Sequence, residues 1–238
     1  MRTSVRTITA TLAATATLAF AGVTPVFAAP SDAEVGAAYG AMLTKKEAAA
    51  LGVRGETMHS FGVTTSDTGT PDAPWLCDLT GVAEVEGKGA RTLFSSEVLS
   101  LGKGAVSDAS QEIHSYASAS VAKRAYDDII AKVTQCTGQQ QPAKDDGEGD
   151  GVDGMTTQLT NGVRKSDRGS FIWVRSQTTI AGAEGFVSHQ YLTVRLVGPY
   201  VQVIEVESEG TNAPDLTAKT IKAADALTMT LGDRWRTS

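Results

Sequence analysis

Two strand patterns that meet at a Gly-Pro turn constrain the fold of the second half of the chain. Residues 185–197 form a long run rich in β-branched and aromatic side chains, and 200–207 continue the pattern after Gly198-Pro199. A third pattern of this kind occupies 170–177. Strands joined by so short a turn pair in the antiparallel direction. We therefore predict an antiparallel meander over this region.

The middle strand of this meander has one apolar face. Leu192, Val194 and Leu196 alternate with more polar residues and so share a face of the sheet. An apolar sheet face has to be covered by another layer. We expect the last helix of the chain to cover it. Pro214 lies in the first turn of that helix, and its apolar stripe consists of Ile221, Ala224, Leu227 and Leu231.

Two more helices are predicted in the first half of the chain. The clearer one covers 119–135, where apolar residues recur at helical spacing after Ser118, a favourable N-cap. The shorter one lies between Thr44 and Gly52. Thr44 and Glu47 have the spacing of a capping box, and Gly52 is suited to end the helix in the left-handed conformation.

Strand patterns at 91–99 and 111–116 complete the predicted elements. Residues 29–40 are small and polar, and we expect them to form a loosely held segment. Together the patterns predict a single α+β domain over 29–238, built as an antiparallel β-sheet with helices packed on it.

The first 28 residues have the pattern of a signal peptide. Arg2 and Arg6 form a basic start, 8–23 are almost uncharged, and a small-x-small motif ends at Ala28. We expect Sec-dependent export, cleavage after Ala28, and a secreted product that does not span the membrane.

Cys77 and Cys136 are the two cysteines of the chain. In an oxidising compartment an even pair is most simply a disulfide. In the chain-entropy account, closing this loop stabilises the fold by about 4 kcal/mol, less any strain. We therefore predict one disulfide that ties the end of the long helix to the body of the domain.

An acidic, glycine-rich segment at 142–154 is the one candidate metal site in the sequence. Asp146, Glu148 and Asp150 match the first oxygen ligands of a calcium loop. Its twelfth position, however, is Thr157, where such loops use a bidentate glutamate. We therefore expect a flexible, solvated insertion and no metal site. We expect no cofactor.

Charge and motifs argue against two classes of function. The chain has 21 Lys and Arg against 27 Asp and Glu, a formal net charge of −6, and no basic cluster. An acidic chain repels the phosphate backbone, so we expect no nucleic-acid binding. His59, His114 and His189 lack the spacing of a zinc site, and no serine lies in a nucleophile elbow. We therefore expect no enzymatic activity.

The candidate ligand contacts are aromatic and basic side chains of the second half. They are Trp173, Arg175, Tyr191 and Arg195. Aromatic side chains line small-molecule sites, and arginines on neighbouring strands can face one ligand together. Two alternatives remain open: the rings belong to the core, or the arginines pair across the strands with the glutamates of 205–207.

The order of these elements resembles that of a known family. The matching stretches are the helix at 43–51, Cys77 after a Pro-containing loop, the strand and helix from 111 to 130 that lead to Cys136, and the hairpin at 191–206 before a closing helix. They resemble the extracellular sensor domain of the mycobacterial serine/threonine protein kinase H, a domain also found in exported actinobacterial proteins.

This resemblance implies an α+β domain with a cleft for an unidentified ligand and no catalysis of its own. The ligand is expected to be a small molecule or an envelope component. The sequence has neither the second cysteine pair common in that family nor a kinase domain, so a signal would pass through a separate membrane signalling protein. The alternative is a structural or protein-interaction component of the cell envelope, with an apolar surface patch instead of a polar site.

Overall fold

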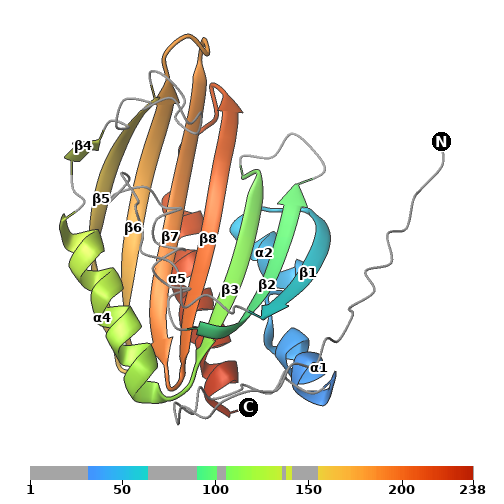
Figure 1. Cartoon of the computed structure of the whole chain (residues 1–238). Helices are drawn as coiled ribbons and strands as arrows, with labels where there is room; N and C mark the ends of the chain where they lie inside the picture. The colour runs from blue at the N-terminus through green and yellow to red at the C-terminus, as the bar shows by residue number, and fades with distance from the viewer. Residues whose placement is uncertain (1–31, 64–89, 101–105, 136–137, 141–154, 238) are drawn as a thin grey trace, which may run out of the picture.

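The computed structural model of the chain describes residues 32–63, 90–100, 106–135, 138–140 and 155–237 (Figure 1). The helices are α1 (Asp32–Ala41), α2 (Lys45–Leu51), α4 (Ala119–Gln135) and α5 (Ala218–Thr237). The strands are β1 (Gly55–Val63), β2 (Ala90–Ser100), β3 (Asp108–Tyr116), β4 (Gly138–Gln140), β5 (Met155–Ser166), β6 (Gly169–Ile180), β7 (Phe186–Val197) and β8 (Tyr200–Thr211).

Several predictions concern residues outside these ranges. They are the cleavage after Ala28, the disulfide between Cys77 and Cys136, and the expectation that the acidic segment at 142–154 is a flexible insertion and not a calcium loop. All of them stay predictions.

The strands form one sheet in the order β1-β2-β3-β8-β7-β6-β5-β4, and every neighbouring pair is antiparallel. This confirms the predicted α+β class with an antiparallel sheet. The predicted hairpin is formed by β7 and β8, where Val197 pairs with Tyr200. Gly198 makes the turn with a φ of 57°, which glycine adopts without steric cost. The pairing of β3 with β8 joins the first three strands to the rest of the sheet.

Helices cover both faces of the sheet, with α4 in front and α5 behind in the view of Figure 1. Helix α4 packs on the face that contains Leu192 and Val194. Helix α5 contacts the opposite face, through Thr193 and Arg195. The prediction that the last helix covers the Leu192 face is therefore wrong.

The polarity of each helix explains this arrangement. On α5, the Thr228 hydroxyl lies 2.6 Å from that of Thr193, and the Met229 carbonyl accepts a 2.7 Å hydrogen bond from Arg195. These groups satisfy the polar residues of β7. Helix α4 instead buries an apolar stripe of Ala122, Ala125, Tyr126, Ile129 and Val133.

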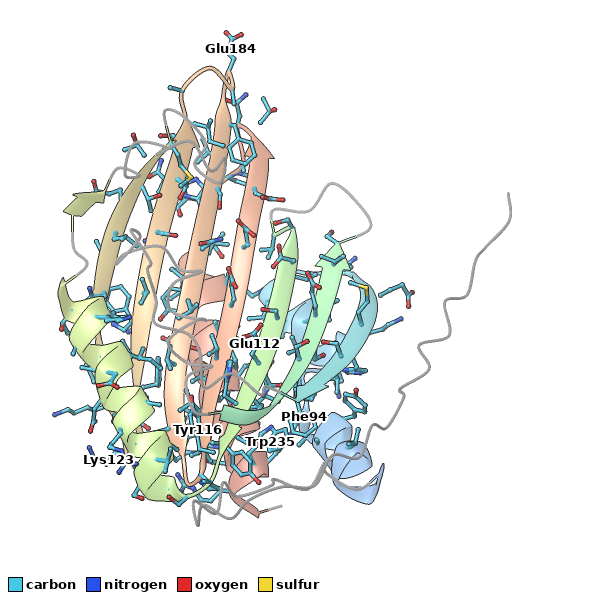
Figure 2. The ribbon with its side chains drawn as sticks, in the orientation of Figure 1. Phe94, Glu112, Tyr116, Lys123, Glu184 and Trp235 are labelled. Carbon is cyan, nitrogen blue, oxygen red and sulfur yellow. The ribbon has the colours of Figure 1, made fainter. Side chains whose placement is uncertain are left out.

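The bounds of α4 agree with the predicted helix, and its outer side is charged as expected. The Ser118 hydroxyl accepts a hydrogen bond from the Val121 amide at 3.3 Å, as an N-cap does. Lys123 projects away from the sheet (Figure 2) and pairs with Asp127 at 2.6 Å. The carboxylates of this helix therefore belong to a solvated face.

The capping box predicted for α2 is also present. The Thr44 side chain accepts from the Glu47 amide, the Glu47 carboxylate accepts from the Thr44 amide, and Gly52 has a φ of 101°. Glu47 is in addition ion-paired with Arg234 of α5. Burial raises the pKa of Glu47, but the hydrogen bonds from Arg234 and Thr44 outweigh it, so the net pKa lies below its usual range.

The expectation of a loose segment at 29–40 is wrong, because α1 occupies most of it. Ala38 and Ala41 are buried in a cluster with Phe94 and Trp235, whose rings are 5.7 Å apart (Figure 2). Small side chains let the helix come close to these rings. Strands β1 and β5 are likewise absent from the prediction, because their polar and apolar residues do not alternate regularly.

Within the described ranges, no helix has both the length and the apolar character needed to cross a membrane.

We expect Thr44→Ala to lower the free energy of unfolding by about 1 kcal/mol, because the substitution removes the side-chain acceptor at the start of α2. Urea denaturation followed by circular dichroism measures this change. Lys46→Ala, on the exposed side of the same helix, is the control and should change stability by less than about 0.5 kcal/mol. Equal effects of the two substitutions would contradict the prediction.

Candidate functional site

The four predicted contact residues lie on one face of β6 and β7, the face on which α5 packs. Arg175 is directly opposite Tyr191, and Trp173 is opposite Thr193. The structure therefore brings Trp173, Arg175 and Tyr191 together. Arg195 lies further along β7, towards the C-terminal end of α5, and is separated from them.

The half-buried indole of Trp173 is the centre of this group. It stacks on the Tyr191 ring with a centroid distance of 6.2 Å and an angle of 23°. The Arg164 guanidinium lies 5.7 Å from its centroid. On β5, Gly162 is directly opposite, and a Cβ there would lie only 2.9 Å from the indole nitrogen. The ring therefore lies across the bare backbone of β5. We call Arg164, Trp173 and Arg175 the Trp173 surface.

Tyr191 supports the Trp173 surface from below. Its side chain is 1% exposed, and its hydroxyl donates a 2.6 Å hydrogen bond to Asp225 of α5. The other carboxylate oxygen of Asp225 pairs with Arg164 at 3.0 Å. Burial, followed by the hydrogen bond to Asp225, raises the pKa of Tyr191 well above its usual value, so the phenol stays protonated.

Arg175 is held at the rim of the surface by Asp215, which precedes α5. The two side chains form an ion pair, and His189 Nδ1 lies 3.4 Å from the same carboxylate. Burial raises the pKa of Asp215, but the hydrogen bond and charge of Arg175 outweigh it, so the net pKa is lowered. Asp215 is therefore ionised at neutral pH.

Arg195 has a different environment, with 1% of the residue exposed. Its guanidinium donates to the Met229 carbonyl at 2.7 Å, to the Arg168 carbonyl at 2.9 Å, and to Asp233 at 2.9 Å. Gly232 leaves the space that this requires, because a Cβ there would lie 2.6 Å from the guanidinium. Arg195 thus fastens the C-terminal part of α5 to the sheet.

The expected cross-strand partners of the arginines are not the ones observed. Glu205 and Glu207 lie on the opposite face of the sheet from Arg195, since Glu205 is paired with Leu192 in the register. Arg175 and Arg195 instead pair with Asp215 and Asp233 at either end of α5. The alternative pairing with the glutamates of 205–207 is wrong.

The chemistry that the Trp173 surface can perform is noncovalent recognition. It presents a half-buried indole with the Arg164 guanidinium 5.7 Å from the ring centroid, and the side chains of Arg164 and Arg175 are 47% and 37% exposed. Asp215 and Asp225 are ion-paired with these arginines, and the lowered pKa of Asp215 makes it a poor general base at neutral pH. In the part of the chain that the structure describes, no three His, Cys, Asp or Glu side chains come close enough to hold a metal ion.

The histidines considered in the sequence occupy separate places. His114 is buried on the α4 side of the sheet, with Nε2 3.3 Å from Glu112, which lies on β3 (Figure 2). His59 is exposed on β1, with its ring 5.2 Å from that of Tyr39. Of the three, only His189 contacts a carboxylate that also binds a candidate residue.

Sequence reasoning missed the residues that position the Trp173 surface. Gly162 carries a weak signal, because glycine inside a strand marks a close approach of another group. Arg164, Asp215 and Asp225 carry none, because they read as ordinary surface charges. Their role depends on α5 lying behind β7, which the sequence prediction placed wrongly.

The fold is an α+β domain with an antiparallel sheet covered on both faces. No family model and no curated protein matches the chain. Among solved structures, it is similar to the crystal structure of the extracellular domain of PknH from Mycobacterium tuberculosis, with 13% sequence identity and a TM-score of 0.46. The match covers 83% of this chain and 98% of that domain. At this identity, no residue role passes from that domain to this chain.

We expect Arg195→Met to lower the free energy of unfolding by about 3 kcal/mol or more, because it leaves buried acceptors without their donor. Arg195→Lys should recover little, since one ammonium cannot reach the carbonyls of Met229 and Arg168 together. Denaturant titration measures both. Arg124→Met, on the exposed side of α4, is the matched control. A loss below about 1 kcal/mol for Arg195→Met would mean that this network is energetically no more than a surface ion pair.

Gly162→Ala should destabilise the domain by about 1–3 kcal/mol, because the new methyl group overlaps the indole of Trp173. It should also change the aromatic circular dichroism, since the ring must move away from Tyr191. Gly36→Ala in α1, where a Cβ meets nothing within 4 Å, is the control. An unchanged aromatic spectrum in Gly162→Ala would show that the indole does not rest on β5.

Proposed function

We propose that this chain is an exported, non-catalytic binding domain, and that the Trp173 surface is where it contacts its ligand. The observation that carries the proposal is the position of Trp173. Its indole is half-buried, lies on the backbone of β5 at Gly162, and has the Arg164 guanidinium 5.7 Å from its centroid, with Arg175 two residues along the same face of β6. Helix α5 packs over β7 and β8 and supports the surface through Tyr191.

The chemistry of the surface favours one kind of ligand. A flat apolar or aromatic group can stack on the indole, and a carboxylate or phosphate can bind the forked donors of Arg175 or Arg164. We infer a small molecule or an envelope component that carries both features. Arg195 enters the proposal as the residue that fixes α5, and with it Asp225, behind the sheet.

A non-catalytic role is supported by the state of the acidic groups. Asp215 and Asp225 each bind a guanidinium of the surface, so their negative charge is neutralised in place. Both groups orient arginines, and the lowered pKa of Asp215 makes that carboxylate a poor proton acceptor at neutral pH. The signal-peptide pattern of the first 28 residues supports export. A sensor role then requires a separate membrane protein that responds to the ligand-bound domain.

A second candidate function rests on an apolar patch elsewhere. Met58 and Leu99 are 49% and 40% exposed. They lie on the same face of the sheet, because Met58 pairs with Glu97 and Leu99 with Glu56. Exposed apolar side chains that lie together favour a protein contact. In this alternative the domain is an interaction component of the cell envelope.

The test is native mass spectrometry of the protein purified from its own culture supernatant, beside a denatured, non-reduced sample. We expect extra mass in the native spectrum that disappears on denaturation. It should be lost in Trp173→Ala and Arg175→Ala and kept in Arg124→Ala, with circular dichroism confirming that each variant is folded. The denatured mass also reports the cleavage after Ala28 and the loss of two hydrogens in the disulfide.

Other outcomes would contradict the proposal. Extra mass that persists in both surface variants would mean that the ligand binds elsewhere. No extra mass, together with an envelope protein that cross-links on intact cells and is lost in Met58→Ser, would favour the interaction role.

A further inference from the structure

Two carboxyl groups face each other across the pairing of β3 with β8. Asp108 and Glu207 are directly opposite in the antiparallel register, and both are half-buried. They lie on the same face of the sheet as Glu112, which Figure 2 labels on β3. Two carboxyl groups opposite each other can hydrogen-bond only when one of them carries a proton.

Glu207 is held in place from several strands. Its Oε1 accepts hydrogen bonds from Ser188 at 2.5 Å and from Gln190 at 3.1 Å, both on β7. Its carbonyl accepts from the amide of Ser107 at 2.8 Å and from the hydroxyl of Ser107 at 2.9 Å. The carbonyl of Ser107 in turn accepts from the Ser100 amide at 2.7 Å. This cluster therefore joins β2, β3, β7 and β8 at one place.

The charged groups around Asp108 are all acidic on the neighbouring strands. Glu207 on β8 faces it directly, and Glu97 on β2 acts on it from the other side. Glu205 and Glu209 lie on the same face of β8, and Glu112, whose carboxylate is 3.3 Å from His114 Nε2, lies further along β3. Ser107 Oγ, 3.4 Å from Asp108 Oδ2, is a donor to the pair.

We propose that Asp108 and Glu207 form a protonation-dependent latch on the pairing of β3 with β8. With one shared proton, the pair hydrogen-bonds the two strands. When Asp108 loses that proton, the two carboxylates repel each other and loosen this end of the pairing. The place matters because β3 and β8 join the first three strands to the other five in the sheet order.

The direction of the pH effect follows from the ionisation of Asp108. Burial, then the charges of Glu207 and Glu97, raise the pKa of Asp108 from 3.8 to about 7. Between these two values the closed state keeps a proton that the open state releases. The closed state is therefore favoured most at low pH, and this advantage is lost as pH rises from about 4 towards 7. Above about 7 both states are ionised and the effect levels off.

Hydrogen exchange of the Ser107 amide tests this latch, because that amide bonds to Glu207. After correction for intrinsic exchange, its opening should increase up to about tenfold per pH unit between pH 5 and 6.5 and level off above about 7. Asp108→Asn keeps a donor to Glu207 but cannot titrate, so its opening should stay flat. Glu209→Gln, an exposed carboxylate on the same face, should behave like the wild type.

Glu97→Gln provides a second variant if Asp108→Asn does not fold. The substitution removes one of the negative charges that raise the pKa of Asp108. The pH at which the opening of the Ser107 amide levels off should therefore be lower than in the wild type. Parallel pH curves for the wild type and Asp108→Asn would overturn the latch. Levelling-off at the same pH in Glu97→Gln as in the wild type would also overturn it. A pH effect of equal size at amides far from the β3–β8 pairing would also overturn it, because it would indicate global unfolding.

Discussion

The buried guanidinium of Arg195 is the interaction on which the rest of the arrangement depends. A charge removed from water is tolerable only when its donors and its charge are all satisfied. Here they are satisfied by backbone carbonyls of α5, by the carbonyl of Arg168 at the β5–β6 turn, and by Asp233. This network fixes the position of α5 behind β7. Asp225 and Asp215 then fall where they can hold Tyr191, Arg164 and Arg175, so the candidate site and the interior network are parts of one structure.

The alternation of β7 divides the domain into two unlike layers. Residues such as Val194 face α4 in an apolar layer, while Thr193 and Arg195 face α5, where hydrogen bonds accompany a second apolar cluster that includes Ile204 and Leu231. An apolar layer tolerates many side chains of similar volume. A layer of directed hydrogen bonds does not, because each unmatched group is costly. The hydrogen bonds of Thr193 and Arg195 therefore specify the orientation of α5, while both helices bury apolar clusters against the sheet.

How much of the structure could be predicted from the sequence depends on whether a feature is local. The hairpin at Gly198, the helix over 119–135 and the capping box of Thr44 and Glu47 rest on short-range rules, and all are confirmed. The presence of α1 and the side of the sheet on which α5 packs depend on distant partners such as Trp235 and Arg195. The predictions of these two features were wrong. Three of the four candidate residues come together because strand alternation places them on one face. Their partners on α5 could not be inferred without knowing where that helix lies.

The position of β3 beside β8 also has a consequence for the order of assembly. The hydrogen bond between Ser107 and Glu207 joins residues 100 apart in the chain. Contacts at such separation form late, since the intervening chain has to be ordered first. As the chain emerges from the ribosome or from a translocation channel, β1, β2 and β3 are available long before β8 is. During that interval β3 has an open edge, the kind of surface on which chains aggregate or chaperones bind. The sheet is completed, and the open edge of β3 is covered, only when the C-terminal hairpin has formed.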